Sequence, residues 1–425
     1  MRWDILRLRR PEIVRAVHPR HFGSRVLFLH IPKTAGTSLS RFLYHQLPAQ
    51  TCLVDPHPAS IDKGEFDRYR LVAGHLDYDI VGRYRCRPFV LTSLRHPIDR
   101  ALSAYYYQRT PRLAIQIRSV ARQIGETTAE QILDDLRRVN SYGTLRAFLR
   151  AEPDFARKTM GNVQTEYLAG AAAVAAYSAQ PDRLLTVARE HLRACDGILL
   201  AEHLPETLAL IDPEWGDRAR ASLQRDNTTP GRRAMRDHAS DELEALAEMT
   251  ALDLDLYRYA ERLIEQRGKI ARPQKPLPLV LPDAADFSFD QPIHGHGFHV
   301  REFRDGDWYC WANRDAALTL KLASVGDHVL DCEVKYVASS EAWTDLAVSV
   351  NGHPVVLTSK PEVPPGRIAA HIPGHWLSQR PDQVCIGFRV AHTVRPSDQD
   401  PSNPDTRRLG IALSRVRLIP ALPLP

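Results

Sequence analysis

The chain has few cysteines, and they do not cluster. The six are Cys52, Cys86, Cys195, Cys310, Cys332 and Cys385. No two of them form a Cys-x-x-Cys pair, so they support neither a zinc site nor a dense disulfide framework. The neighbouring histidines His294, His296 and His299 lack a partnering acid or cysteine. We therefore expect free thiols in a reducing compartment and no bound metal.

Long apolar runs are absent as well. No stretch approaches the roughly 18 apolar residues that a membrane-spanning helix needs. The chain starts with the charged segment Met1-Arg-Trp-Asp4, and no apolar stretch typical of a signal peptide follows it. We therefore expect a cytoplasmic protein without a transmembrane segment.

Composition and charge are those of a globular protein. The 425 residues are 44% hydrophobic and 25% charged, which excludes a disordered or fibrous chain. This length predicts two domains, because one core rarely grows past roughly 250–300 residues. Arginine greatly outnumbers lysine, and guanidinium groups suit phosphate or sulfate. The net charge of +5 is mild, and no basic stripe is interleaved with aromatic residues, so we expect no nucleic-acid partner.

The pattern of residues 1–270 predicts an α/β domain. Strand-like runs occur at Arg25–His30, Leu71–Ala73, Phe89–Leu94 and Gly197–Leu200. Amphipathic stretches such as Ile98–Gln108 and Pro205–Ile211 lie between or after them. Alternating strands and helices indicate a parallel sheet with helices on both faces. Residues 127–194 are expected to be largely helical, and one long amphipathic helix, about Ser240–Arg267, is expected to close the domain.

The composition then changes. Residues 271–283 are rich in proline and predict a semi-stiff linker. Residues 284–425 contain short β-rich runs separated by turns, among them Asn351-Gly352, a strong hairpin signal. We expect an antiparallel β-sandwich accessory domain here. Its aromatic residues could stack on sugars or form the sandwich core. They are Trp308, Tyr309, Trp311, Trp343 and Trp376.

The first motif with chemical meaning is a phosphate-binding loop. It is Leu29-His-Ile-Pro-Lys-Thr-Ala-Gly-Thr-Ser38, between a predicted strand and a predicted helix. Such a junction aims unpaired amides and the helix dipole at an anion. Gly36 permits close approach of the backbone, and Lys33 adds a positive charge. The lysine precedes the glycine, so this is not the Walker pattern of an ATP or GTP enzyme.

The second motif follows another strand. In Leu94-Arg-His-Pro-Ile-Asp-Arg-Ala-Leu-Ser-Ala-Tyr105, Pro97 fits the first turn of a helix. Arg95 would lie at the carboxyl end of its strand, where open α/β sheets bind ligands. Ser103 lies two turns into the helix. Arg95 and Ser103 could together bind a second phosphate.

Both motifs resemble a known family. Ile31-Pro-Lys-Thr-Ala-Gly-Thr-Ser38 is similar to the 5′-phosphosulfate loop of carbohydrate sulfotransferases related to the heparan sulfate 2-O and 6-O enzymes. The segment Leu94–Tyr105 is similar to the 3′-phosphate motif of that family, in the same order and at a similar spacing. Asn162–Leu168 and Asp253–Tyr259 add to the resemblance, which covers about residues 24–265.

The resemblance implies a P-loop-like domain that uses 3′-phosphoadenosine 5′-phosphosulfate and no metal. The residues implied at the 5′-phosphosulfate are Lys33, Thr34, Ala35, Gly36, Thr37 and Ser38. Arg95 and Ser103 would bind the 3′-phosphate. Lys33 would also stabilise the leaving phosphate. His75, in a Gly-His context similar to that of the family's base, is the expected catalytic base, and Asp77 is the alternative.

Several assignments remain expectations. His30 is expected to be structural, and Asn162 and Gln164 either position a ligand or cap a helix. The loop Arg225–Gly231 is a candidate cover for the adenine. Eukaryotic members of the family are usually Golgi-anchored, so the expected setting is a bacterial-type cytoplasm. The implied acceptor is a glycan or glycan-containing molecule. The alternatives are a nucleotide-dependent kinase of P-loop type and a non-catalytic glycan-binding protein.

Overall fold

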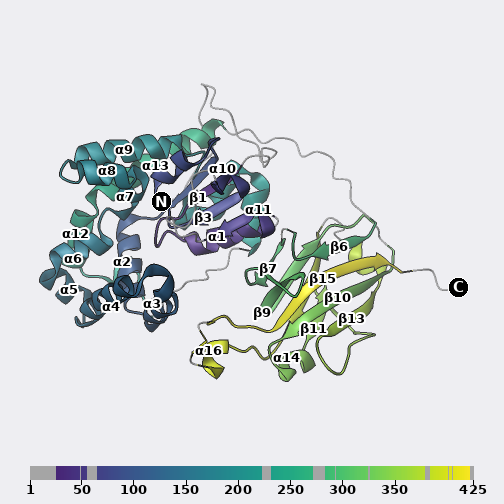
Figure 1. Cartoon of the computed structure of the whole chain (residues 1–425). Helices are drawn as coiled ribbons and strands as arrows, with labels where there is room; N and C mark the ends of the chain where they lie inside the picture. Colours follow the sequence, from purple (N-terminus) through teal and green to yellow (C-terminus); the bar gives the residue numbers. More distant parts are fainter. Residues whose placement is uncertain are drawn as a thin grey trace. The chain divides into compact units, whose positions relative to one another are not determined.

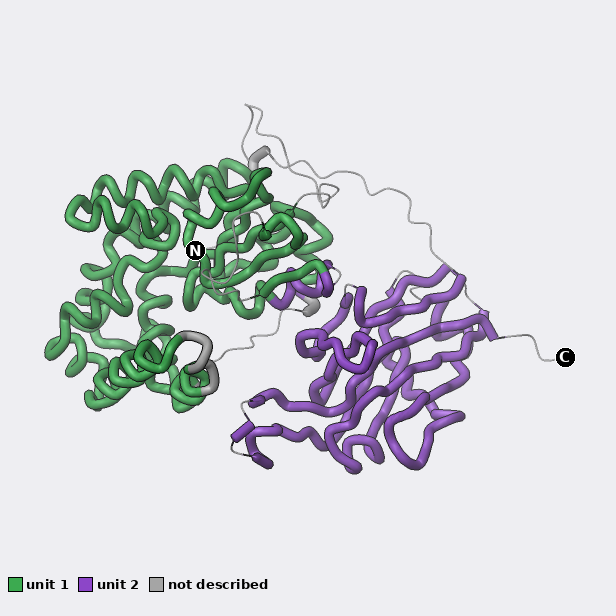
Figure 2. The backbone as a smooth tube through the Cα atoms, viewed as in Figure 1, with its two compact units in different colours: residues 1–40, 51–219, 225–273 green, residues 41–50, 220–224, 274–425 purple. Residues whose placement is uncertain are grey.

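The computed structural model forms two compact units (Figure 2). Unit 1 comprises residues 1–40, 51–219 and 225–273, and unit 2 comprises residues 41–50, 220–224 and 274–425. The residues that the structure describes are 25–47, 49–54, 65–222, 231–270, 283–291, 293–323, 326–378, 383–400, 402–403 and 405–421. Most of the expected linker and of the loop Arg225–Gly231 lies outside the described residues.

Unit 1 contains the expected parallel sheet (Figure 1). Its five strands run in the order β2-β3-β1-β4-β5. They are β1 (Val26–Leu29), β2 (Cys52–Val54), β3 (Leu71–Gly74), β4 (Phe89–Leu94) and β5 (Gly197–Leu200). Strands β1, β3 and β5 are buried along their whole length, which explains their continuous apolar sequences. The sequence prediction missed only β2, the short, half-exposed strand at one edge.

Helices accompany the sheet in residues 36–270 (Figure 1). They are α1 (Gly36–His45), α2 (Pro97–Gln108), α3 (Pro111–Ile124), α4 (Glu126–Asn140), α5 (Leu145–Ala151), α6 (Pro153–Met160), α7 (Val163–Ala169), α8 (Ala171–Tyr177), α9 (Pro181–Ala194), α10 (Leu204–Ile211), α11 (Pro213–Ser222), α12 (Ser240–Met249) and α13 (Ala251–Ile270). Short 3₁₀ turns are η2 (Ala49–Thr51), η4 (Glu65–Arg68), η5 (Tyr78–Arg83), η6 (Ala201–His203) and η7 (Met235–Asp237). The mixed α/β class and the helical middle segment are thereby confirmed.

One helix prediction was wrong. The single long helix expected over Ser240–Arg267 is two helices, α12 and α13, separated at Thr250. Thr250 leaves helical geometry, with φ −109° and ψ 22°. Its side-chain hydroxyl donates to the carbonyl of Leu246 at 2.7 Å. A threonine that bonds the preceding turn competes with continued helix formation, which the apolar periodicity does not reveal.

Two apolar clusters stabilise unit 1. One cluster combines sheet residues such as Leu27, Val72 and Val90 with α9 and α13. The other lies among α2, α4, α5, α6 and α12, around the fully buried Phe148. In the parallel sheet, Leu29 at the end of β1 pairs with Gly74 of β3 and with Thr92 of β4. The carboxyl ends of β1, β3 and β4 therefore lie side by side.

Unit 2 is antiparallel, as expected. Its strands are β6 (Ala285–Ser288), β7 (Gly295–Phe298), β8 (Glu302–Arg304), β9 (Asp307–Leu320), β10 (His328–Val337), β11 (Ala347–Val350), β12 (His353–Val355), β13 (Gly366–Ile372), β14 (Val384–Arg389) and β15 (Ile411–Pro420). They form one connected ten-stranded sheet in which the long strand β9 pairs with β15 in its first half and with β14 in its second. Residues from both halves share one apolar core. Short helices complete the unit: α14 (Ser340–Thr344), α15 (Gly374–Leu377) and α16 (Pro396–Gln399).

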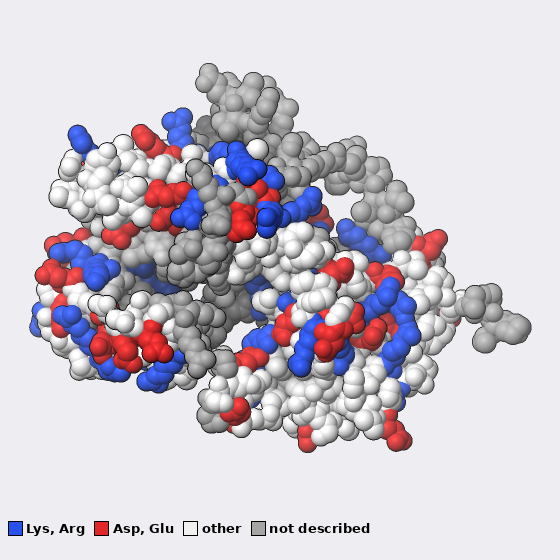
Figure 3. All heavy atoms as spheres, in the orientation of Figure 1, with Lys and Arg blue, Asp and Glu red and all other residues white. Residues whose placement is uncertain are grey.

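The predicted Asn351-Gly352 hairpin is confirmed. Val350 of β11 pairs with His353 of β12 across it, and both turn residues have positive φ, at 50° and 85°. These angles match the tight turns that favour Asn-Gly. On the visible face of unit 2, acidic and basic side chains are interleaved (Figure 3). Within unit 2, Asp331 pairs with both Arg367 and Arg417.

Candidate functional site

The site begins with a strained loop between β1 and α1. Two non-glycine residues of this loop, Lys33 and Ala35, adopt left-handed backbone angles, with φ of 70° and 64°. Such angles cost about 1–3 kcal/mol each and persist where the surrounding structure enforces them. The loop leads directly into the first turn of α1, which holds the exposed Thr37 and the half-buried Ser38. Backbone amides at such a junction suit an anion.

Thr34 fixes this loop to the sheet. Its side chain is fully buried, and its hydroxyl donates to the carbonyl of Ile31 at 2.8 Å. The same oxygen lies 2.8 Å from the hydroxyl oxygen of Ser93 on β4. The hydroxyl of Thr34 is thus committed to holding the loop. Of this residue, only the backbone amide is suited to a ligand.

Gly36 is required by the packing of a histidine. A Cβ atom at this position would lie 1.7 Å from Cδ2 of His30. The ring of His30 is 6% exposed, and its Nδ1 has no hydrogen-bond partner among the described residues. Burial, with His75 and Lys33 nearby, lowers the pKa of His30 to about 3. This imidazole is therefore neutral at physiological pH, in line with its expected structural role.

Arg95 connects the two sequence motifs. It leaves the carboxyl end of β4, and its Nη1 donates to the carbonyl oxygen of Lys33 at 3.3 Å. Its Nε donates to Asp99 Oδ2 at 2.7 Å, and Asp99 also pairs with Arg232. Burial would raise the pKa of Asp99, but Arg95 and Arg232 hold it below its usual value. Two guanidinium groups therefore face one carboxylate, so the local charge is positive and suits an anion.

The side chain of Lys33 contacts the last turn of α2. Its ammonium nitrogen is 3.6 Å from the centre of the Tyr107 ring, at the end of α2. A cation over an aromatic face is stabilised by about 0.5–2 kcal/mol. Tyr107 therefore holds the lysine at the loop. Tyr107, Asp99 and Arg232 were not predicted as site residues. The Arg95–Asp99 contact spans four residues and was open to prediction, whereas the contacts of Tyr107 and Arg232 join separate segments that no linear pattern connects.

His75 lies beside His30. It follows Gly74 at the carboxyl end of β3 and is exposed. Its ring centre is 4.3 Å from that of His30. The alternative base, Asp77, caps η5 by accepting a hydrogen bond from the amide of Asp79 at 3.1 Å. Burial and the charge of Asp79 raise the pKa of Asp77.

Ser103 has a different setting. It lies on α2 and is 4% exposed, between the buried residues Leu102 and Ala104. The structure therefore brings Lys33, Arg95 and His75 to one edge of the sheet, whereas Ser103 is packed into the helix layer beside it. The role implied for Ser103 remains an expectation.

Gln164 and Asp253 stabilise the backbone at Arg95 through buried hydrogen bonds. Both are buried, at 1% and 0% exposure. The Gln164 side chain bonds the backbone of Arg95, and Asp253 accepts bonds from the amides of Gln164 and Thr165 at 3.1 and 2.7 Å. The segments Asn162–Leu168 and Asp253–Tyr259, noted separately in the sequence, therefore form one structural element. The sequence analysis considered Gln164 but found no signal for its contact with Arg95.

The aromatic residues of unit 2 divide into two groups. Tyr309 and Trp343 are buried, at 4% and 3% exposure, and so belong to the protein interior. Trp308, Trp311 and Trp376 are half-buried. The burial of Tyr309 and Trp343 favours a role in the core of unit 2 over stacking on sugars.

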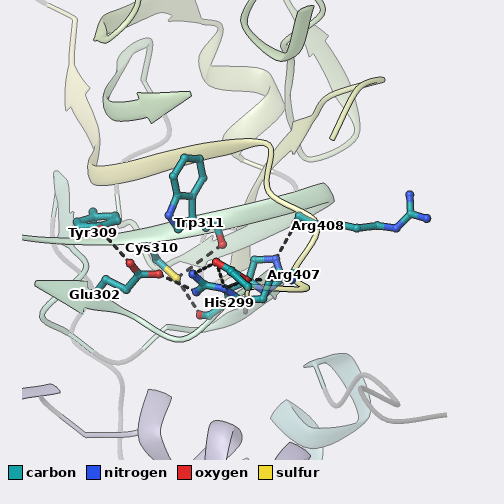
Figure 4. Close-up of polar contacts among 8 residues, drawn as sticks. His299, Glu302, Tyr309, Cys310, Trp311, Arg407 and Arg408 are labelled. Atoms are coloured by element: carbon teal, nitrogen blue, oxygen red, sulfur yellow. Dashed lines mark hydrogen bonds and ion pairs between the residues drawn. The ribbon is translucent and has the colours of Figure 1, made fainter. Parts of the chain in front are cut away.

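The polar network near Tyr309 is internally paired (Figure 4). Arg407 pairs with both Glu302 and Asp405, and the hydroxyl of Tyr309 donates to Glu302 at 2.8 Å. His299 Nε2 lies 2.8 Å from the carbonyl oxygen of Arg408. No group of three or more potential metal ligands occurs among the described residues, which include all members of the His294–His299 cluster.

Comparison with known proteins establishes no family for the chain. No protein-family model and no curated protein matches the chain. One matching solved structure is a family GH115 4-O-methyl-alpha-glucuronidase with specificity for decorated arabinogalactans, at 12% sequence identity and a TM-score of 0.20. The match covers 72% of this chain and 41% of that chain. A TM-score this low does not establish a common fold. Within the described residues, no helix has the length and apolar character needed to cross a membrane.

Proposed function

We propose that the chain is a sulfotransferase that moves a sulfuryl group from 3′-phosphoadenosine 5′-phosphosulfate to a hydroxyl of a glycan or glycan-containing acceptor. One observation carries the proposal: the Arg95 guanidinium donates to the carbonyl of Lys33. This bond joins the two segments that resemble the 3′-phosphate and 5′-phosphosulfate motifs of carbohydrate sulfotransferases. A ligand with two anionic groups would bind to both segments at once.

The donor would bind at the carboxyl edge of the parallel sheet, as ligands do in open α/β folds. The strained loop and the first turn of α1 would bind the 5′-phosphosulfate in a P-loop-like manner through backbone amides and the hydroxyls of Thr37 and Ser38. Arg95 and Arg232 would bind the 3′-phosphate. Each would give up part of its ion pair with Asp99 to do so.

The reaction is an in-line displacement at sulfur. The acceptor oxygen forms a bond to sulfur while the bond between sulfur and the 5′-phosphate oxygen breaks. The hydroxyl proton passes to His75, and 3′-phosphoadenosine 5′-phosphate leaves as the product. Lys33 and the loop amides stabilise the charge that develops on the leaving phosphate. Positioning and electrostatics therefore supply the rate enhancement.

The acceptor class rests on the resemblance to carbohydrate sulfotransferases. Unit 2 would serve as an accessory module that recognises or docks the acceptor, not as a second catalyst. Its half-buried Trp308, Trp311 and Trp376 are the candidates for stacking on sugar rings.

Calorimetric titration of the full chain with 3′-phosphoadenosine 5′-phosphate tests the donor site, with ATP as the comparison ligand. We expect binding of the bisphosphate in preference to ATP. Lys33→Ala and Arg95→Ala should each weaken it roughly ten- to a hundredfold, the effect of losing one charge-assisted contact.

Arg87→Ala is the matched control. Arg87 precedes β4 at the opposite edge of the sheet and pairs with Asp196, so its removal should leave the affinity unchanged. Preferential binding of ATP would contradict the proposal and favour the kinase alternative. Tight binding of the bisphosphate without turnover on any glycan acceptor would favour a non-catalytic glycan-binding protein.

A further inference from the structure

One side chain satisfies the whole backbone of Arg95. The amide of Arg95 donates to Gln164 Oε1 at 2.9 Å, and Gln164 Nε2 donates to the carbonyl oxygen of Arg95 at 3.0 Å. Arg95 follows the last residue of β4 and precedes α2, which begins at Pro97. At this junction the sheet has ended and the helix has not begun. Gln164 takes the place that a neighbouring strand would otherwise fill.

Gln164 is itself held firmly. Its side chain is 1% exposed, and its backbone amide donates to Asp253 Oδ2 at 3.1 Å. Asp253 is completely buried and also accepts bonds from the amide and the hydroxyl of Thr165, both at 2.7 Å. The amide of Asp253 in turn donates to Asn162 Oδ1 at 3.1 Å. The N-terminal turn of the short helix α7 is thus tied to α13 through buried or half-buried groups.

We infer that Gln164 is a positioning residue for the anion site: it fixes the backbone of Arg95, and with it the direction of the guanidinium toward the 3′-phosphate. This inference rests on the proposed function. Two bonds to one residue, an acceptor for its N–H and a donor for its C=O, restrict rotation about that residue more than either bond alone. The guanidinium stays within reach of Lys33 and Asp99 without the ligand, so binding need not order it.

The test separates positioning from a general structural role. Gln164→Met keeps the length of the side chain and removes both bonds. We expect it to weaken binding of 3′-phosphoadenosine 5′-phosphate about tenfold. In the Arg95→Ala background, where no guanidinium remains to be positioned, the same change should weaken binding less than twofold. Such non-additivity is the signature of two residues that act through one contact.

Two further variants control the experiment. Gln164→Asn keeps the amide group on a shorter side chain, which reaches fewer of the partner atoms. This variant should fold and lose less affinity for the bisphosphate, and the loss should again depend on Arg95. Thr165→Val removes a hydroxyl that bonds the same Asp253 without touching Arg95. It should leave the affinity as in the wild type. Circular dichroism and urea unfolding of each variant establish that it is folded.

The outcomes are distinguishable. If the wild type does not bind the bisphosphate, the proposed function is wrong and the inference fails with it. If the wild type binds it and folded Gln164→Met and Gln164→Asn bind it equally well, the inference alone is wrong. Equal weakening by Gln164→Met with and without Arg95 would assign Gln164 a structural role only, which also overturns the inference.

Discussion

The imidazole rings of His30 and His75 lie 4.3 Å apart, with their planes 43° to one another. The first ring is buried and the second is exposed. The buried ring also stacks on Phe28, 5.8 Å away between ring centres. A buried, neutral ring therefore lies against an exposed one beside the loop between β1 and α1.

His75→Ala should separate catalysis from donor binding. If His75 is the base, the variant loses at least about a hundredfold in turnover with 3′-phosphoadenosine 5′-phosphosulfate. Its affinity for 3′-phosphoadenosine 5′-phosphate should change little, because the phosphates bind to other groups. Sulfate transfer to an acceptor and calorimetric binding measure the two effects. Asp77→Asn is the comparison, and full turnover by His75→Ala with loss in Asp77→Asn would make Asp77 the base.

Gly36→Ala should destabilise the protein. The new methyl group would meet the His30 ring, where a Cβ would lie 1.7 Å from Cδ2. Forcing a methyl group into a packed site costs about 1–3 kcal/mol. The free energy of unfolding in urea measures the loss. Gly143→Ala is the matched control, since nothing lies within 4 Å of a Cβ there. Equal stability of the two variants would contradict the packing described for His30.

His30 should make stability depend on pH below neutrality. Because the pKa of this buried group is about 3, the folded state resists protonation that the unfolded state accepts near pH 6.5. Stability should therefore fall as the pH decreases from about 6.5 toward 3, by about 2–3 kcal/mol at pH 4.5. His30→Gln does not titrate and should lack this component. Urea unfolding of both proteins at pH 7 and 4.5 measures it, and parallel losses would show that His30 does not contribute.

Asp253→Asn should be strongly destabilising. Its carboxylate accepts bonds from Gln164 and Thr165 and interacts electrostatically with the buried Arg100. Asparagine has one acceptor oxygen in place of two, so it leaves a buried donor unsatisfied, which typically costs about 1–3 kcal/mol. Asp255→Asn changes an exposed carboxylate on the same helix, whose pair with Arg258 should contribute under about 1 kcal/mol. Thermal unfolding of the two variants compares them. A similar small effect of both would contradict the role assigned to Asp253.

The cysteines should differ in reactivity. Cys86 is exposed, whereas Cys195 and Cys310 are buried, and burial raises the pKa of each of these two thiols to about 12. A thiol-specific reagent such as 5,5′-dithiobis(2-nitrobenzoate) should label Cys86 rapidly in the native protein. Cys195 and Cys310 should react only on unfolding. Cys86→Ser should slow the labelling, leaving the half-buried Cys52 and Cys385 as the most accessible thiols. Unchanged labelling kinetics would contradict the exposure described for Cys86.

Much of the fold could be predicted from local sequence. Strands β4 and β5 begin and end where their apolar runs do, because strands buried on both faces have continuous apolar sequences. The Asn351-Gly352 turn was predictable because few other residue pairs accept its backbone angles. The break at Thr250 was not predictable, since it depends on a hydroxyl that bonds the previous turn while the apolar periodicity continues.

The candidate site also has parts that local sequence predicts and parts that it does not. The loop with Lys33 and the position of Arg95 after a strand could be predicted, since strand–loop–helix junctions are local features. The bond from Arg95 to the carbonyl of Lys33 and the contact of Gln164 with the Arg95 backbone could not. They arise because the parallel order of the strands places distant segments at one edge of the sheet. Which side chains meet there depends on packing between elements, and no local pattern in the sequence encodes that.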